Sequence, residues 1–181
     1  MSKALIVIDL QNDYATGGAM ALHGIEAAVA NAAKIIADFR SKNIPVIHIQ
    51  HIFSDSDAPF FRPDSQGAEI QKAVQPLNGE DVVVKNNVNA FLNTDLQNVL
   101  DKYKPTELVI LGAMSHMCVD AGVRAASDLG YNITVIHDAC ATLELEFNGI
   151  KVPAEQVHAA FMASLKFAYA DLQSVDEYLT I

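Results

Sequence analysis

Short runs of consecutive apolar residues recur along this chain and alternate with segments of helical spacing. The runs cover residues 4–9, 45–51, 81–85, 107–113 and 132–139, and a weaker sixth run covers 168–175. Strands that are apolar at consecutive positions are buried on both faces, which is typical of a parallel sheet covered by helices. The pattern therefore predicts an α/β fold.

Segments with helical period lie between these runs. Residues 25–42 carry an apolar stripe at every third or fourth position, as an amphipathic helix does. Further helices are predicted over 94–103 with Thr94 as N-cap, over 118–130, and over 153–166 starting at a proline. Alternating strands and helices build a three-layer domain. Since no Pro/Gly/Ser-rich linker interrupts them, we expect a single domain over residues 1–181.

Composition and charge exclude several classes of protein. The chain has 181 residues, 51% of them hydrophobic, and a net charge of -10 without any Lys/Arg cluster. An acidic surface repels phosphates, so nucleic-acid binding is not expected. No apolar stretch approaches the ~18 residues of a membrane span, and no signal peptide is apparent. We therefore expect a cytoplasmic protein without membrane partners, in which Cys118 and Cys140 stay reduced.

Three residues able to do chemistry follow predicted strands. Asp9 ends the first strand, Lys85 ends the third, and Cys118 comes shortly after the fourth. Each has a structural explanation: Asp9 as a loop cap, Lys85 as a solvated lysine, and Cys118 as a core residue. Because ligands bind beyond the carboxyl ends of parallel strands, an acid, a base and a thiol at one sheet edge favour an active site.

The chemistry of these groups suggests roles for them. A cysteine at a helix N-terminus beside a lysine is expected to be stabilised as a thiolate. The carboxylate of Asp9 can take the thiol proton and return it to a leaving group. Backbone N–H groups at the turn before Cys118 can hold a developing oxyanion. Together these groups could carry out nucleophilic attack on a carbonyl carbon.

The segments around these residues resemble the isochorismatase-like cysteine hydrolases. "LIVIDLQNDY" is similar to the family's first strand with its catalytic aspartate, here Asp9. "VVVKNNVNAFLNTDL" resembles the segment that bears the lysine, here Lys85, and "LVILGAMSHMCVDAGVRAASDLG" resembles the nucleophile segment, here Cys118. The three motifs occur in the family's order and extend over nearly the whole chain.

The resemblance carries several expectations. It implies a Rossmann-like, mostly parallel six-stranded sheet of order 3-2-1-4-5-6, and hydrolysis through a thioester on Cys118. It also implies a cis peptide between Ala113 and Met114, with the N–H groups of Met114 and Cys118 forming the oxyanion hole. Relatives commonly assemble, so a homodimer or homotetramer is expected.

The chain departs from the metal-binding members of that family. Nicotinamidases carry an Asp-x-His and a further His after the second strand, whereas this chain reads "HIQHIFSDSDAPFF". His48 and His51 are three apart on a strand, so they should face opposite sides and not share an ion. We therefore expect no catalytic metal and no other cofactor, and nicotinamide becomes a less favoured substrate.

A long irregular stretch, residues 52–80, is the candidate pocket wall. The adjacent phenylalanines in it should either fold inward over Cys118 or pack at a subunit contact. Asn86 and Asn87 could hydrogen-bond the substrate or be exposed to solvent, and the sequence favours neither alternative. The candidate substrate-binding residues from this stretch and from the segments after the first and third strands are Tyr14, Phe60, Phe61, Arg62, Asn86 and Phe91.

These observations favour a cysteine hydrolase that cleaves a C–N bond of a small amide, ureido or carbamoyl compound. One alternative is an isochorismatase-type ether hydrolase, although such members can lack the cysteine that this chain keeps. Another is a non-enzymatic ligand-binding or thiol redox protein on the same fold. His116 is interpreted as a surface or pocket-wall residue, and Cys140, which has no helix dipole or basic neighbour, as structural.

Overall fold

A parallel six-stranded sheet forms the centre of the computed structural model, which describes residues 2–180. Its strands stand in the order β3-β2-β1-β4-β5-β8, and every neighbouring pair is parallel. This confirms the predicted sheet, with β8 as its sixth strand. The strands are β1 (Lys3–Ile8), β2 (Val46–His51), β3 (Asp81–Lys85), β4 (Glu107–Ala113), β5 (Asn132–Ala141) and β8 (Asp171–Gln173).

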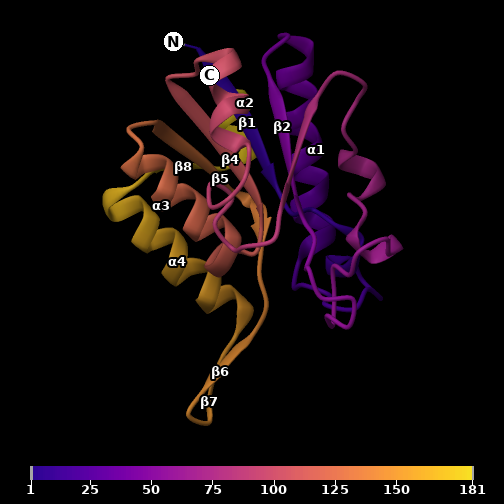
Figure 1. Cartoon of the computed structure of the whole chain (residues 1–181). Helices are drawn as coiled ribbons and strands as arrows, with labels where there is room; N and C mark the ends of the chain where they lie inside the picture. The colour runs from indigo at the N-terminus through magenta and orange to yellow at the C-terminus, as the bar shows by residue number, and fades with distance from the viewer. Residues whose placement is uncertain (1, 181) are drawn as a thin grey trace.

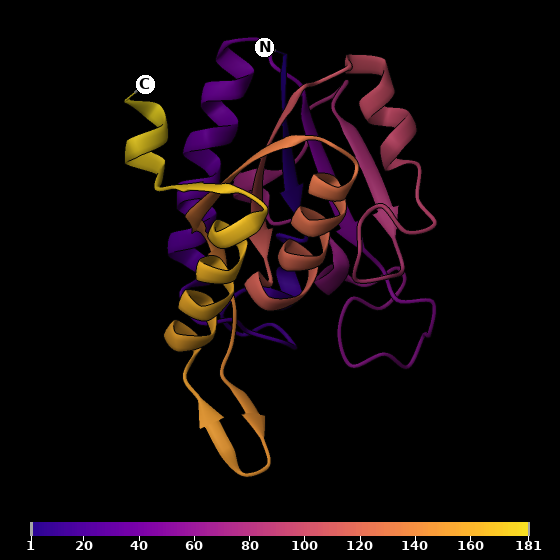
Figure 2. The same ribbon diagram turned by 90° about the vertical axis from the view of Figure 1, so that its left-hand side faces the viewer.

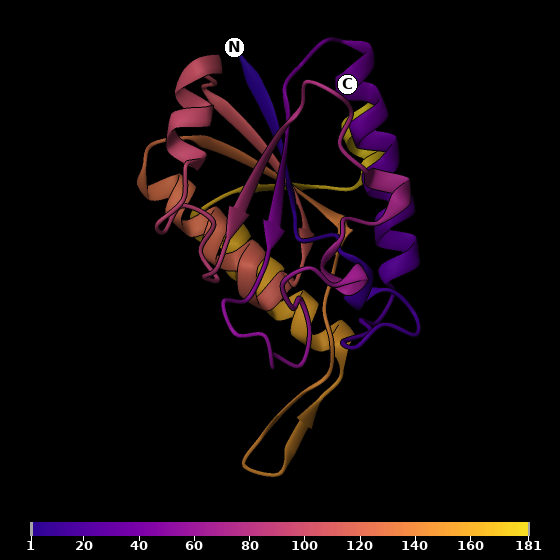
Figure 3. The ribbon, with the colours of Figure 1, turned by 45° about the vertical axis from the view of Figure 1, so that its right-hand side comes forward.

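Helices cover both faces of this sheet, as Figure 1 shows. α1 (Ile25–Ser41) and α5 (Val175–Leu179) lie on one face, while α3 (Asp120–Asp128) and α4 (Ala154–Ala168) lie on the other. α2 (Leu96–Tyr103) lies on the same side as α3 (Figure 3). The central strands β1 and β4 are buried along almost their whole length, which accounts for their uninterrupted apolar sequences.

Short helical turns complete the connections between these elements. They lie mainly after β1, in the long segment after β2, and after β4. Their bounds are η1 (Asn12–Tyr14), η2 (Gln66–Ala68), η3 (Lys72–Val74) and η4 (Ser115–Val119), of which η4 is a π-helical turn.

The structure corrects three expectations about individual elements. β3 is an edge strand, so Val82 and Val84 are 41% and 48% exposed although their apolar run predicted burial on both faces. α2 is preceded by Asp95 as its N-cap, and the Thr94 hydroxyl instead donates to the Ala90 carbonyl oxygen. α5 begins at Val175, the last residue of the predicted 168–175 strand, and the apolar pattern did not indicate this helix.

A hairpin of two short strands also escaped the sequence analysis. β6 (Leu145–Phe147) and β7 (Ile150–Val152) pair antiparallel and project from the body of the molecule (Figure 2). Phe147 and Ile150 near its tip are 77% and 66% exposed. Within residues 2–180, no helix has the length and apolar character that crossing a membrane requires.

Gly112 brings the carboxyl ends of β4 and β1 together. It has a φ of 131°, and a Cβ at this position would lie 2.0 Å from the Ile8 carbonyl oxygen. Only glycine fits both the backbone conformation and the close approach. Since Ile8 directly precedes Asp9, this contact sets the distance between Asp9 and the turn that follows β4.

Candidate active site

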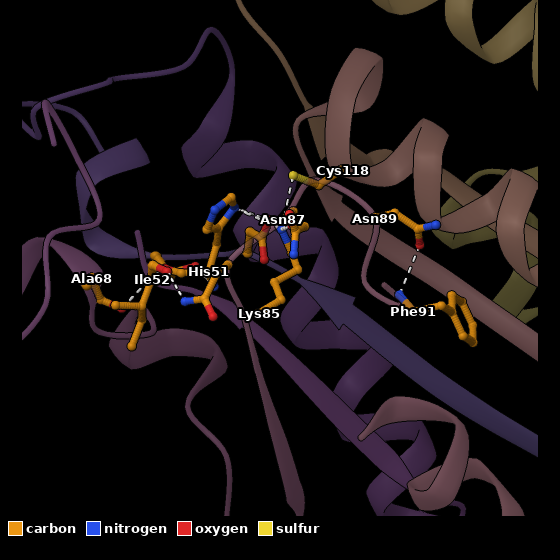
Figure 4. A network of polar contacts seen from close by, with 11 residues as sticks. His51, Ile52, Ala68, Lys85, Asn87, Asn89, Phe91 and Cys118 are labelled. Atoms are coloured by element: carbon orange, nitrogen blue, oxygen red, sulfur yellow. Dashed lines mark hydrogen bonds and ion pairs between the residues drawn. The ribbon is translucent and has the colours of Figure 1, made fainter. Parts of the chain in front are cut away.

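The side chain of Lys85 lies between the groups that the sequence singled out (Figure 4). Its Nζ atom is 2.8 Å from Oδ2 of Asp9 and 3.2 Å from Sγ of Cys118. Asp9 follows β1, Lys85 ends β3, and Cys118 lies in η4 after β4. Because the three strands run in parallel, their carboxyl ends deliver all three side chains to one edge of the sheet.

These side chains are almost completely shielded from solvent. Asp9 is 0% exposed, Lys85 1% and Cys118 3%. Burial removes the screening that water provides, so each charge interacts strongly with its neighbours. Removal of one partner from such a buried ion pair leaves an uncompensated charge, which destabilises the folded protein.

Cys118 does not begin a helix, contrary to the sequence-based expectation. It lies inside the π-helical turn η4, which has Met114 as its N-cap, and the regular helix α3 starts only at Asp120. π-helical turns are rare and frequently occur at functional sites. The peptide bond between Ala113 and Met114 is cis, as the resemblance implied. The oxyanion hole formed by Met114 and Cys118 stays a prediction.

The resting thiol is protonated, which also differs from the expected thiolate. Burial raises the pKa of Cys118, and the Asp9 carboxylate raises it further against the opposing effect of Lys85. Burial likewise raises the pKa of Asp9, again opposed by Lys85. Two coupled groups then share one proton. A carboxylate with a raised pKa beside a protonated thiol is chemically able to accept the thiol proton.

His51 joins this site, although the sequence analysis considered it only as a metal ligand. Its Nδ1 lies 2.9 Å from Nζ of Lys85 and 3.9 Å from Oδ2 of Asp9. Burial and the Lys85 charge lower the pKa of His51 to about 4, so the ring is neutral at physiological pH. Its Nε2 is buried without a hydrogen-bond partner. The signal in the sequence was its place at the end of the second strand, beside the strand that ends in Lys85.

Three side chains of this site could together bind a metal ion. Asp9, His51 and Cys118 offer ligand atoms within 4.8 Å of one another. The Lys85 ammonium, however, contacts each of these three side chains and so supplies the positive charge that a metal ion would bring. His48 does not take part, because its Nε2 is 3.1 Å from Oε2 of Glu80. The two histidines therefore have different partners, as their spacing predicted.

Two further residues of the "IDLQNDY" segment support the site, and both were overlooked. The side-chain amide of Gln11 accepts a hydrogen bond from the His51 N–H and donates to the His51 carbonyl oxygen, both at 2.8 Å. Asp13 accepts a 2.7 Å hydrogen bond from the N–H of Phe61. Buried side chains that satisfy the backbone of a neighbouring segment fix its position.

An aromatic cluster lies beside His51. The ring centroid of Tyr14 is 4.6 Å from that of Phe61, and Phe60 lies 5.0 Å from Phe61. Phe61 is completely buried beside His51 and Phe60 is half-buried, while neither the position over Cys118 nor a subunit contact is shown for them. Arg62 is exposed and lines, together with Phe60, a surface cavity of about 390 Å³ whose lining does not include the triad.

The asparagines after β3 have roles other than the expected one. The side-chain amide of Asn86 donates to the Ile52 carbonyl oxygen at 2.6 Å and so ties the long segment to β3. The backbone carbonyl of Asn87 accepts a 3.0 Å hydrogen bond from Nζ of Lys85. Phe91 is half-buried, and its ring points away from Lys85 and Cys118 in Figure 4. The structure thus shows neither Asn86 nor Phe91 directed at the thiol.

The remaining candidates have structural partners. Nδ1 of His116 lies 2.6 Å from the Thr142 hydroxyl oxygen. Cys140 is buried, and its thiol donates to the Ile136 carbonyl oxygen at 3.4 Å. The Cys140 contact agrees with the structural interpretation of that residue, and His116 is half-buried beside Thr142.

Comparisons with known proteins match this fold and this arrangement of segments. The isochorismatase domain model matches residues 3–177. YddQ of Bacillus subtilis, an uncharacterised isochorismatase family protein, is 48% identical over 179 residues, which cover 99% of each chain. The crystal structure of a candidate isochorismatase hydrolase from Oleispira antarctica is 54% identical with a TM-score of 0.96, covering 99% of this chain and 97% of that one.

A more distant relative has a named activity. Ureidoacrylate amidohydrolase of Rhizobium rhizogenes is 28% identical over 178 residues, which cover 80% of this chain and 72% of that enzyme. The match of the family model to nearly the whole chain, the sheet order and the high structural similarity agree with one another. The chain therefore belongs to the isochorismatase family and is a hydrolase.

Proposed function

We propose that this protein is a cysteine hydrolase that cleaves a C–N bond of a small amide, ureido or carbamoyl compound. The observation that carries the proposal is the position of Nζ of Lys85, 2.8 Å from the Asp9 carboxylate and 3.2 Å from the Cys118 sulfur. Such an arrangement supplies a nucleophile, a base and a fixed positive charge in one desolvated place.

Acylation begins with transfer of the thiol proton of Cys118 to Asp9. The resulting thiolate attacks the carbonyl carbon, and the carbonyl oxygen takes the negative charge, which the N–H groups of Met114 and Cys118 are proposed to stabilise. The C–N bond then breaks as the protonated Asp9 donates its proton to the leaving nitrogen. Ammonia or an amine departs, and a thioester remains on the sulfur.

Deacylation repeats these steps with water. Asp9, again a carboxylate, takes a proton from a water molecule while the oxygen of that water attacks the thioester carbon. The C–S bond breaks, the acid product leaves, and the sulfur regains its proton from Asp9. Lys85 stays positive throughout and stabilises whichever of its two neighbours is negative.

The burial of the site favours a small substrate. A thiol that is 3% exposed leaves little room for a polymer or a bulky acyl group without movement of the surrounding segments. The similarity to a relative named ureidoacrylate amidohydrolase supports the C–N class.

An ammonia-release screen tests the proposal. Small primary amides, ureido acids and carbamoyl compounds should be incubated with the wild-type protein, and ammonia and acid product measured together. We expect stoichiometric release of both from at least one of these classes, with a thioester on Cys118 detectable by mass spectrometry after rapid acid quench. Cleavage of an isochorismate-type vinyl ether without any thioester would favour the ether-hydrolase alternative.

The redox alternative is less favoured by the structure. Cys118 and Cys140 are both free and buried, and the Cys140 thiol is bonded to a backbone carbonyl on β5. A sensing cysteine is normally accessible and close to a resolving thiol. A binding protein, in turn, has no need of a buried base beside a thiol.

We propose that the reaction needs no metal, since the Lys85 ammonium already lies among the groups that could ligate one. Treatment with EDTA or 1,10-phenanthroline should leave kcat and KM unchanged within error. Elemental analysis of the purified protein provides the control. Stoichiometric zinc or iron, together with loss of activity on its removal and recovery on its return, would contradict this prediction.

We further propose that the protein forms a homodimer or homotetramer. The support is exposed apolar surface on the hairpin and on α4. Phe147 and Ile150 on the hairpin are 77% and 66% exposed, and Phe167 on α4 is 91% exposed. Exposed apolar clusters often mark interfaces. Sedimentation velocity should show an oligomer that Phe147→Ser with Ile150→Ser weakens. A monomer at every concentration would exclude it.

A further inference from the structure

The ammonium group of Lys85 has more neighbours than it has protons. Nζ lies 2.8 Å from Oδ2 of Asp9, 2.9 Å from Nδ1 of His51, 3.0 Å from the Asn87 carbonyl oxygen and 3.2 Å from Sγ of Cys118. An ammonium carries three N–H donors and no acceptor. At any moment, therefore, at most three of these four neighbours receive a full hydrogen bond.

Two of these neighbours keep the same protonation state during the reaction. The Asn87 carbonyl is a backbone acceptor with no proton to gain or lose. His51 is neutral because burial and the nearby ammonium lower its pKa to about 4. Its Nδ1 faces a group that can only donate, so Nδ1 is the acceptor and Nε2 carries the ring proton. These two acceptors hold two of the three N–H groups in every protonation state of the site.

The other two neighbours exchange a proton with each other. Before attack, Asp9 is the anion and Cys118 the neutral thiol. After the proton moves, Cys118 is the anion and Asp9 the neutral acid. A hydrogen bond to an anion is roughly twice as strong as one to a neutral group. The remaining N–H of Lys85 is therefore drawn first to the carboxylate and then to the sulfur, with little movement of the nitrogen.

The backbone of His51 is fixed in a way that suits this role. Gln11 bonds both the N–H and the carbonyl oxygen of His51 through its side-chain amide, at 2.8 Å each. Phe53 packs on the imidazole with the ring centroids 4.5 Å apart. A ring held at its backbone and on its face has little freedom to turn its Nδ1 away from the ammonium.

We propose that His51 is a positioning residue for Lys85, an inference that rests on the proposed function of the triad. Together with the Asn87 carbonyl, His51 orients the ammonium so that its third N–H follows the negative charge from Asp9 to Cys118. The imidazole takes no proton from substrate or thiol. Its contribution is the fixed direction of a positive charge.

Two substitutions at this position separate positioning from packing. His51→Leu replaces the imidazole by an apolar side chain of similar size and so removes the acceptor. His51→Asn places an amide oxygen near the former Nδ1. We expect His51→Leu to lower kcat on the order of 10- to 100-fold with little change in KM, because a misdirected catalytic group loses about that much. Alkylation of Cys118 at a given pH should also slow, because an ammonium that is free to turn stabilises the thiolate less.

His51→Asn should restore most of kcat and return the alkylation rate of Cys118 towards that of the wild type. His48→Leu is the matched control, because His48 lies on the same strand, is equally buried and contacts Glu80 instead of the triad. It should lower thermal stability without altering the pH profile. If His51→Leu folds poorly, His51→Asn is compared with the wild type alone. A folded His51→Asn variant that has lost most of the wild-type kcat would overturn the proposal.

The rate of Cys118 alkylation by iodoacetamide, measured against pH, gives a readout that needs no substrate. A wild-type profile in His51→Leu would overturn the positioning role while leaving the triad intact. Failure of the proposed function looks different: Cys118→Ala would then keep hydrolase activity, whatever the result at His51. The two failures are therefore distinguishable.

Discussion

Replacing Cys118 with alanine should abolish turnover while leaving the fold intact. The sulfur is the proposed point of covalent attachment, and no other thiol lies near the Asp9 carboxylate among residues 2–180. Alanine is well tolerated in helical turns, and the change removes one buried sulfur. We expect the activity found in the ammonia-release screen to fall to the background of the uncatalysed reaction, with a circular dichroism spectrum like that of the wild type.

Cys140→Ala is the matched control, because Cys140 is the chain's other cysteine and is buried as well. Its thiol bonds to the Ile136 carbonyl oxygen on the same strand, so its loss should affect stability more than kcat. Retention of activity by Cys118→Ala, or its loss in Cys140→Ala alone, would show that the nucleophile is wrongly assigned.

Asp9→Asn should lower kcat by about two to four orders of magnitude, which is the usual contribution of a general base. The amide keeps the shape of the side chain but cannot take the thiol proton. Alkylation of Cys118 at neutral pH should not slow in parallel, because the change also removes the Asp9 charge that helps to raise the pKa of the thiol. Thermal unfolding must be recorded as well, because the variant leaves the buried Lys85 ammonium without its counter-ion.

The pH dependence provides a second readout for Asp9. Burial raises its pKa above the ordinary value of 3.8, so the wild type should lose activity as the pH falls through this raised value. The acid limb belongs jointly to Asp9 and Cys118, because the two groups are coupled. Asp9→Asn should lack this limb, whereas Asp13→Asn, which removes a nearby charge but keeps an acceptor for the Phe61 N–H, should retain it. An unchanged acid limb in Asp9→Asn would contradict the assignment of the base.

The apolar pattern was sufficient to predict the sheet and its approximate strands. Runs such as "ALIVI" and "LVILGA" are apolar at every position because helices cover both sides of β1 and β4. The pattern failed at β3, where the same kind of run lies at the sheet edge and leaves Val82 and Val84 exposed. An edge strand and a central strand can have the same composition, since only the neighbours differ. The hairpin β6–β7 escaped because its strands have three residues each.

By itself the sequence determined that Asp9, Lys85 and Cys118 meet, because parallel strands bring their carboxyl ends to one edge. Only the tertiary structure decided how charge is arranged there. Whether a thiol rests protonated depends on its burial and on its distance to a carboxylate, and neither can be read from positions 109 residues apart along the chain. The same holds for His51, whose neutrality and contact with Lys85 follow from packing between neighbouring strands.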